Sequence, residues 1–123
     1  MEIIKKEKVI TEIDKKSGEI RRYFLFGSFE LAITETPPHH IQPQHYHKET
    51  VELNYVIEGT MIAKEGDREV ELSSGEVVCF RPGHTFHSIE NPTDKKLIFA
   101  TIKTPALSGS YREIFQRDKF TKK

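Results

Sequence analysis

The chain of 123 residues has one cysteine, no tryptophan and no apolar run that could span a bilayer. A single cysteine excludes an internal disulfide framework, and Cys79 lies in an apolar segment, where we expect a small buried hydrophobe. Residues 1–7 lack the apolar run of a signal peptide. These absences predict a cytoplasmic protein that has no membrane partner.

Neither sign of charge is in excess, because nineteen basic residues balance nineteen acidic residues. Such a chain lacks the overall field that would favour nucleic acid or an anionic surface, so we expect no nucleic-acid partner. The length predicts one domain that spans residues 1–123. The basic residues 119–123 are expected to form a solvated, disordered tail.

Helical periodicity is almost absent, and short strand-like segments follow one another along the chain. They are bounded by glycine, proline, serine or asparagine, and they cover residues 8–13, 19–26, 28–33, 52–57, 60–64, 69–72, 77–80, 86–90 and 97–103. This pattern predicts an all-β antiparallel sandwich or barrel. A short C-terminal helix is predicted only after Ser110, where Tyr111, Ile114 and Phe115 would share one face.

All six histidines lie between His39 and His87, and two segments of this region have the spacing of metal ligands. In a strand, His45 and His47 lie on one face, because side chains alternate with a period of two. Glu52 returns on the neighbouring strand, and His87 comes from a third. Three neutral imidazoles and one carboxylate suit Zn, Fe, Mn, Ni or Co better than Ca or Mg. The alternatives are ordinary polar residues near a loop, or a set that acts directly on a substrate.

These two segments resemble the two sequence motifs of the cupin superfamily. The matching residues are His45, His47, Glu52, Gly59, Gly75, Gly83, His87 and Asn91. The sequence departs from the motifs where His39 replaces a glycine and where Arg81 stands at an expected proline, in a run that is one residue longer. The resemblance implies a double-stranded β-helix, or jelly-roll barrel. It also implies one divalent transition metal (Fe, Mn, Ni or Zn), with His45, His47, Glu52 and His87 as its ligands.

Strand parity and the loops of the expected barrel mouth give candidates for a substrate pocket. These candidates are Asn54, Ile89, His39, His40, His84 and Arg81. The first two share the inward faces of Glu52 and His87. The three histidines lie in loops that would ring the mouth, although a loop histidine is usually only solvated. Arg81 would suit a carboxylate or phosphate if it points inward, and a surface salt bridge is the alternative.

The resemblance leaves two classes of function open, and both have a small-molecule ligand in the barrel. One is a metal-dependent enzyme, a dioxygenase or an isomerase or epimerase, because four protein ligands leave positions open on an octahedral metal. The other is a non-catalytic cupin that binds or senses a small ligand. Glu52 stands where sugar-nucleotide ketoisomerases of the superfamily carry glutamine, which argues against their metal-free mechanism. Open sheet edges and the apolar C-terminal face predict a homodimer.

Overall fold

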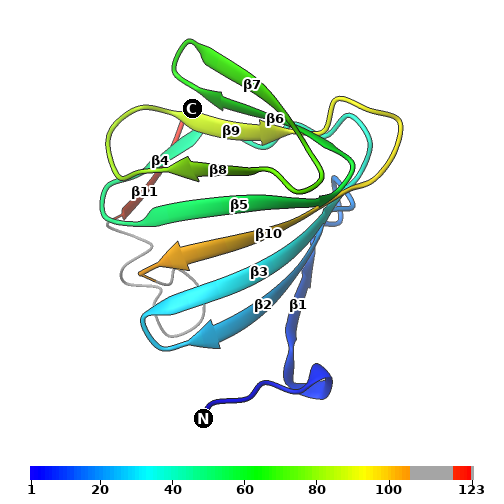
Figure 1. Cartoon of the computed structure of the whole chain (residues 1–123), viewed down its shortest axis with the longest axis vertical. Coiled ribbons are helices and arrows are strands. Elements are labelled where there is room, and N and C mark those ends of the chain that lie inside the picture. Colours follow the sequence, from blue (N-terminus) through cyan, green and yellow to red (C-terminus); the bar gives the residue numbers. More distant parts are fainter. Residues whose placement is uncertain (106–117, 123) are drawn as a thin grey trace.

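The computed structural model describes residues 1–105 and 118–122, in which two antiparallel β-sheets face each other (Figure 1). A 3-10 helix, η1 (Lys6–Lys8), precedes them. One sheet has the order β1-β2-β3-β10-β5-β8, with strands Ile10–Ile13, Ile20–Phe26, Phe29–Thr36, Leu97–Thr104, Val51–Glu58 and Val77–Phe80. The other has the order β11-β4-β9-β6-β7, with strands Lys119–Thr121, His45–His47, His87–Glu90, Thr60–Glu65 and Arg68–Ser73. No helix in these ranges is long and apolar enough to cross a membrane.

Alternating side chains divide each strand between the interior and the surface. In β5, Asn54 and Val56 are buried, whereas Leu53, Tyr55 and Ile57 are exposed. β10 lies between β3 and β5, so its inward residues face both neighbours across the ladder. The sheet therefore presents one regular inner face, on which the side chains of a site can be placed.

The interior has an apolar part and a polar part. The apolar cluster lies mainly between β5, β6, β8 and β10 and consists of Val56, Met61, Ala63, Leu72, Phe80, Ile89, Leu97 and Phe99. On β3 the inward residues are instead Glu30, Ala32, Thr34 and Thr36, and Thr101 of β10 is buried beside Asn54. Buried polar groups are costly unless they are paired, so this part of the interior is suited to a polar ligand.

The tight turn between β5 and β6 explains why glycine occupies position 59. Gly59 has a φ of +93°, in the left-handed region that favours glycine. A Cβ atom at this position would lie 2.8 Å from the carbonyl oxygen of Lys96, which is too close for any side chain. The turn packs against the start of β10 and fixes the register in which β5 carries Glu52 and Asn54.

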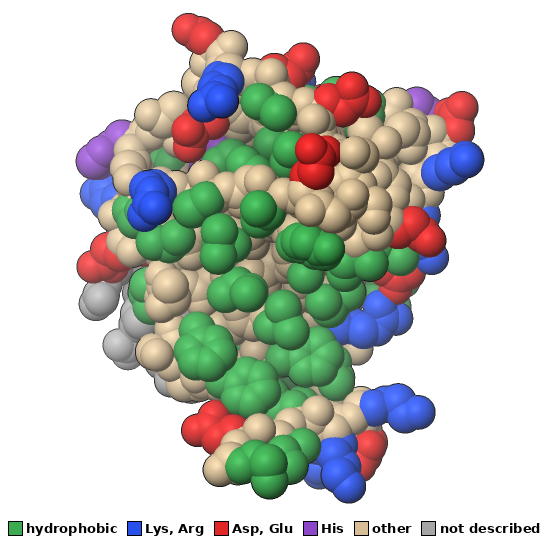
Figure 2. All heavy atoms as spheres, viewed as in Figure 1, with side chains coloured by type: hydrophobic (Ala, Val, Ile, Leu, Met, Phe, Trp, Pro, Cys, Tyr) green, Lys and Arg blue, Asp and Glu red, His purple; other side chains and the backbone are tan. Residues whose placement is uncertain are grey.

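The outer face of the six-stranded sheet is largely apolar, and Figure 2 shows hydrophobic side chains gathered over it. Exposed apolar residues on this face include Leu53, Tyr55, Ile57, Val77 and Ile102. Cys79 shares the outward parity of Val77 and is exposed, so the expectation of a buried cysteine was wrong. The hydrophobic run of residues 77–80 could not distinguish the two faces of the strand.

The C-terminal residues also differ from the sequence prediction. Residues 119–123 were expected to be disordered, but Lys119–Thr121 forms β11 and pairs with β4. The ring of Phe120 stacks on Tyr46, with a centroid distance of 5.1 Å, and Lys48 Nζ lies 4.6 Å from the centroid of Phe120. A single aromatic residue within a basic run therefore docks the segment. The helix expected after Ser110 lies outside the described residues.

Candidate metal centre

The four predicted ligands come together in the interior from three strands. His45 and His47 lie on β4, Glu52 on β5 and His87 on β9, and one candidate ligand atom from each residue lies within 4.8 Å of all the others. His45 is paired directly with His87 in the β4–β9 ladder. All four side chains are buried. The alternation of β4 thus brings both of its histidines to the same inner face, as the His-x-His spacing predicts.

Hydrogen bonds fix the orientation of two of the imidazole rings. His47 Nδ1 lies 2.7 Å from a carboxylate oxygen of Asp118, and His45 Nδ1 lies 3.0 Å from the carbonyl oxygen of Pro43. Since carboxylate and carbonyl oxygens only accept, each Nδ1 donates its proton and leaves Nε2 with a free lone pair. Outer contacts of this kind set the tautomer of metal-binding histidines.

Two nitrogens at the centre of the cluster are buried without a hydrogen-bond partner. These are Nε2 of His47 and Nε2 of His87, which lie 3.3 and 3.9 Å from the carboxylate oxygens of Glu52. Buried polar atoms in native proteins are nearly always satisfied, so such a pair beside a carboxylate needs an explanation. A cation that accepts lone pairs from imidazole and carboxylate would satisfy all of these atoms. The residues present therefore fit a metal ion.

The protonation states of the cluster are also those that a cation requires. Burial lowers the pKa of His45 to about 3 and that of His87 to about 4, so both rings are neutral at neutral pH. Burial alone would raise the pKa of Glu52. The positive charge of Lys103 and the neighbouring histidines nevertheless lower it well below its ordinary value. His45 and His87 consequently present neutral nitrogens beside an ionised carboxylate, and these three groups need to release few protons when a cation binds.

Asp118 is a functional residue that the sequence analysis missed. Its carboxylate is fully buried, and besides contacting His47 it accepts the backbone N–H groups of Glu49 and Thr50. Its own carbonyl oxygen accepts from the N–H of Lys48 at 2.8 Å. Asp118 thus joins the beginning of β11 to the loop between β4 and β5. It lies 71 residues from His47 and belongs to neither motif, so no signal in the single sequence marks it.

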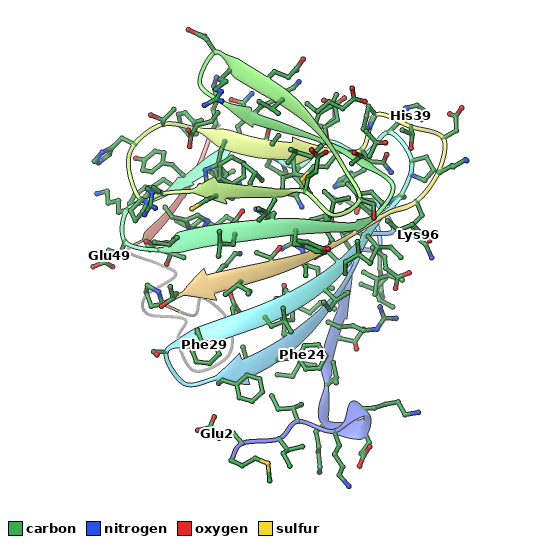
Figure 3. The ribbon with its side chains drawn as sticks, viewed as in Figure 1. Glu2, Phe24, Phe29, His39, Glu49 and Lys96 are labelled. Carbon is green, nitrogen blue, oxygen red and sulfur yellow. The ribbon has the colours of Figure 1, made fainter. Side chains whose placement is uncertain are left out.

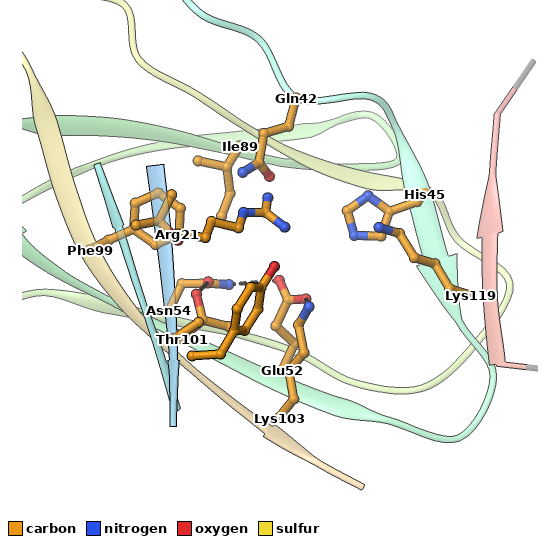
Figure 4. A pocket seen from close by; sticks show the side chains of 13 residues that line it. Arg21, Gln42, His45, Glu52, Asn54, Ile89, Phe99, Thr101, Lys103 and Lys119 are labelled. Carbon is orange, nitrogen blue, oxygen red and sulfur yellow. Dashed lines mark hydrogen bonds and ion pairs between the residues drawn. The ribbon is translucent and has the colours of Figure 1, made fainter. Parts of the chain in front are cut away.

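A cavity borders the cluster, and His45 and Glu52 belong to both (Figure 4). The lining residues are Arg21, Tyr23, Ala32, Thr34, Gln42, His45, Glu52, Asn54, Ile89, Phe99, Thr101, Lys103 and Lys119. The volume of this cavity is about 30 Å³. The cavity therefore suits a small ligand.

A chain of hydrogen bonds holds the carboxylate of Glu52 at the boundary between cluster and cavity. Thr101 donates its hydroxyl to the amide oxygen of Asn54 at 2.6 Å, and the amide nitrogen of Asn54 donates to Glu52 at 2.9 Å. The other oxygen of Glu52 lies 3.7 Å from Lys103 Nζ. Asn54 and Thr101 are both buried, so the carboxylate is oriented before anything binds.

Of the six predicted pocket residues, Asn54 and Ile89 line this cavity and the other four do not. His39 is exposed at the periphery, where its ring lies 2.6 Å from Asp94 (Figure 3). His40 lies 3.7 Å from Glu19, and Arg81 is exposed. The ring of His84 packs against Tyr46. Tyr46 has the opposite parity to His45 and His47, so His84 packs on the outer side of β4. A role for these four loop residues in binding a substrate stays a prediction.

Comparison with solved structures shows the same fold at low sequence identity. A sugar phosphate isomerase from Silicibacter pomeroyi matches with a TM-score of 0.74 and 18% identity, over 85% of this chain and 76% of its own. KdgF from a Halomonas species matches with a TM-score of 0.73 and 14% identity, over 86% of this chain and 94% of its own. Oxalate decarboxylase from Bacillus subtilis matches with a TM-score of 0.74 and 16% identity, over 94% of this chain and 30% of its own. At these identities the likeness concerns the fold alone.

The sequence itself identifies the family. A family model for the cupin domain matches residues 32–103, which contain the four clustered residues and most of the strands around them. The nearly all-β structure with two antiparallel sheets confirms the predicted double-stranded β-helix. The chain therefore belongs to the cupin superfamily.

Proposed function

We propose that this cupin is an enzyme that binds one divalent transition metal ion, Fe, Mn, Ni or Zn, through His45, His47, Glu52 and His87. Its substrate would be a small molecule held in the adjoining cavity. The observation that carries the proposal is the pair of buried, unpartnered Nε2 atoms beside Glu52, at the wall of a cavity. The carboxylate oxygens of Glu52 lie 3.3 and 3.9 Å from these nitrogens, so a cation placed there would bind both imidazoles and the carboxylate.

The surroundings of the cluster favour catalysis over a purely structural role. Structural zinc sites are closed and usually rich in thiolate, whereas this cluster contains no cysteine and Cys79 lies on the outer surface. His45 and Glu52 face the cavity, so a bound molecule would lie directly against the cluster. A divalent metal held there would supply Lewis acidity toward an oxygen atom of the substrate.

The chain's own residues would position the substrate and exclude water. Asn54 and Thr101 orient Glu52, while Phe99 and Ile89 form an apolar wall of the cavity. We place the reaction in the oxygenase or the isomerase and epimerase class, since both use a metal with open positions. The similar solved structures include a sugar phosphate isomerase and an oxalate decarboxylase, which supports a small polar substrate.

Elemental analysis of the untagged protein tests the metal. We expect about one transition metal ion per chain in the wild type and in His40→Ala, and a large loss in His47→Ala. His40 is the matched control, since it lies outside the cavity lining. A wild type that is metal-free and fails to take up Fe, Mn, Ni or Zn would refute the site. If the metal binds and small-molecule ligands also bind without turnover, the protein is a binding or sensing cupin, which is the alternative function.

A further inference from the structure

Three cationic side chains from three different strands converge on the cavity. Arg21 comes from β2, Lys103 from β10 and Lys119 from β11, and all three are partly buried. Figure 4 shows their nitrogen-bearing ends directed into the space beside His45 and Glu52. Among the described residues that line this cavity, Glu52 is the only acidic one. The lining thus has an excess of positive charge in a chain that has no net charge.

Two of these cations, Arg21 and Lys103, lie close to carboxylates that also have other partners. Arg21 Nη2 lies 3.1 Å from Glu19, which also accepts hydrogen bonds from Thr36 and Gln42. The carboxylate nearest to Lys103 is the metal ligand Glu52, at 3.7 Å. A bound metal ion would take up the negative charge of Glu52 and add to the positive potential of the cavity.

The other two cations act on the pKa of Lys119. Burial is the main cause that lowers the pKa of Lys119 to about 8, and the charges of Lys103 and Arg21 lower it further. Grouping partly buried cations carries a free-energy cost. The neighbouring Arg22 differs from Arg21, because it points outward and forms a surface salt bridge with Glu35 at 2.5 Å.

We propose that Arg21, Lys103 and Lys119 form a subsite for the carboxylate group of a small organic acid, which is the substrate class of this cupin. This inference rests on the proposed function, because the subsite and the metal cluster share one cavity. A guanidinium binds a carboxylate through two parallel hydrogen bonds, and the lysines add point charges. The restricted space favours a planar carboxylate over a bulkier phosphate ester.

The geometry also orients the substrate. Arg21 enters from the six-stranded sheet and Lys119 from the strand that pairs with β4, so an anion between them lies next to His45. An oxygen-bearing carbon adjacent to the carboxylate would then face Glu52 and the metal cluster. Recognition and chemistry would therefore involve different ends of one small molecule, which is how binding energy can orient a reacting group.

Calorimetric titration with malonate tests the subsite, with malonamide as the uncharged molecule of similar size. We expect malonate to bind the metal-loaded protein, and malonamide to bind at least about tenfold more weakly. Arg21→Gln and Lys119→Gln should each weaken malonate binding by about tenfold or more. Arg22→Gln and Lys122→Gln, which change an outward arginine and an exposed lysine, should not alter it. Equal loss in the test and control variants would overturn the subsite.

Metal content measured on every variant separates this proposal from the proposed function. Arg21→Gln and Lys119→Gln should keep their metal while losing the ligand, whereas His47→Ala loses the metal. Normal metal content with no discrimination between malonate and malonamide would overturn the carboxylate subsite and leave the metal site intact. Tighter binding of glycerol 3-phosphate than of malonate would overturn the assignment to carboxylates. Malonate binding that survives chelation, and still requires Arg21 and Lys119, would support the subsite independently of the metal.

Discussion

Burial of His45 and His87 in the folded chain makes it harder for their imidazole rings to bind a proton. In the unfolded chain each has the ordinary pKa of about 6.5. Burial lowers the pKa of His45 to about 3 and that of His87 to about 4 in the folded, metal-free protein. At pH values between these folded-state pKa values and about 6.5, the unfolded state binds more protons than the folded state. The free energy of unfolding is therefore highest at neutral pH and decreases as the pH falls below about 6.5. The expected slope is about 1.4 kcal/mol per pH unit for each histidine.

Urea unfolding of chelator-treated protein, in a pH series from about 7 to about 5, measures this slope. His45→Gln should reduce the slope by about half, because one of the two coupled groups is removed. His84→Gln is the control, since that histidine is exposed in a loop and should leave the slope unchanged. A free energy of unfolding that stays flat across this range would contradict the coupling.

At the residue scale, spacing predicts some members of the site and cannot predict others. His45, His47, Glu52 and His87 could be assembled because strand parity and two nearby motifs constrain them. Arg21 and Lys119 could not be assigned to the site, because they lie far from the cluster in sequence. Only the tertiary fold brings them close to it. Parity within a strand indicates that Arg21 and Arg22 face opposite sides, but it does not say which side is inside.

At the scale of secondary structure, most strands could be predicted and their ends and partners could not. Residues 28–33 were expected to be a strand, whereas β3 continues to Thr36, where the inward threonines pair with β10 and β2. Residues 34–44 contain three prolines, which favour a loop from residue 34 onward, but the strand includes residues 34–36. The strand β11 was missed because propensity within a basic run is weak, and its formation depends on long-range packing against Tyr46.

The docking of β11 supports the orientation of a proposed metal ligand, because Asp118 directly precedes this strand and contacts His47. Phe120→Ala removes the stacking on Tyr46 and should lower the free energy of unfolding by about 1–3 kcal/mol. It should also weaken metal affinity, toward the 10- to 100-fold loss typical when an outer partner of a metal-binding histidine is removed. Competition with a chromophoric chelator measures the affinity.

Two further variants separate packing from orientation in that experiment. Asp118→Asn places an amide beside His47 Nδ1 and should weaken metal affinity while β11 stays docked. Phe29→Ala, on the opposite sheet, also removes a stacked aromatic ring but should leave the affinity unchanged. An unaltered affinity in both Phe120→Ala and Asp118→Asn would show that β11 does not support the metal centre.

At the scale of the whole molecule, the outer face of the six-stranded sheet exposes apolar side chains. Leu53, Tyr55, Val77 and Ile102 are exposed on neighbouring strands of this sheet. Figure 2 shows a broad region of hydrophobic side chains on this side of the molecule. Contiguous exposed apolar surface of this kind marks an interaction site. Arg22 and Lys96 both pair with Glu35, so the charges of these outward residues are partly balanced within one copy.

We therefore propose a homodimer in which the two sheets pack face to face. Tyr55 lies at the centre of this surface, between Ala100 and Val77, and Tyr55→Glu should convert the dimer to a monomer because it would bury a charge. Val70→Glu is the matched control, since Val70 is equally an exposed apolar strand residue but belongs to the other sheet. Light scattering at micromolar concentration measures the mass. A monomeric wild type would refute the dimer, whereas a dimer that survives Tyr55→Glu would move the contact to the strand edges or to residues 110–115.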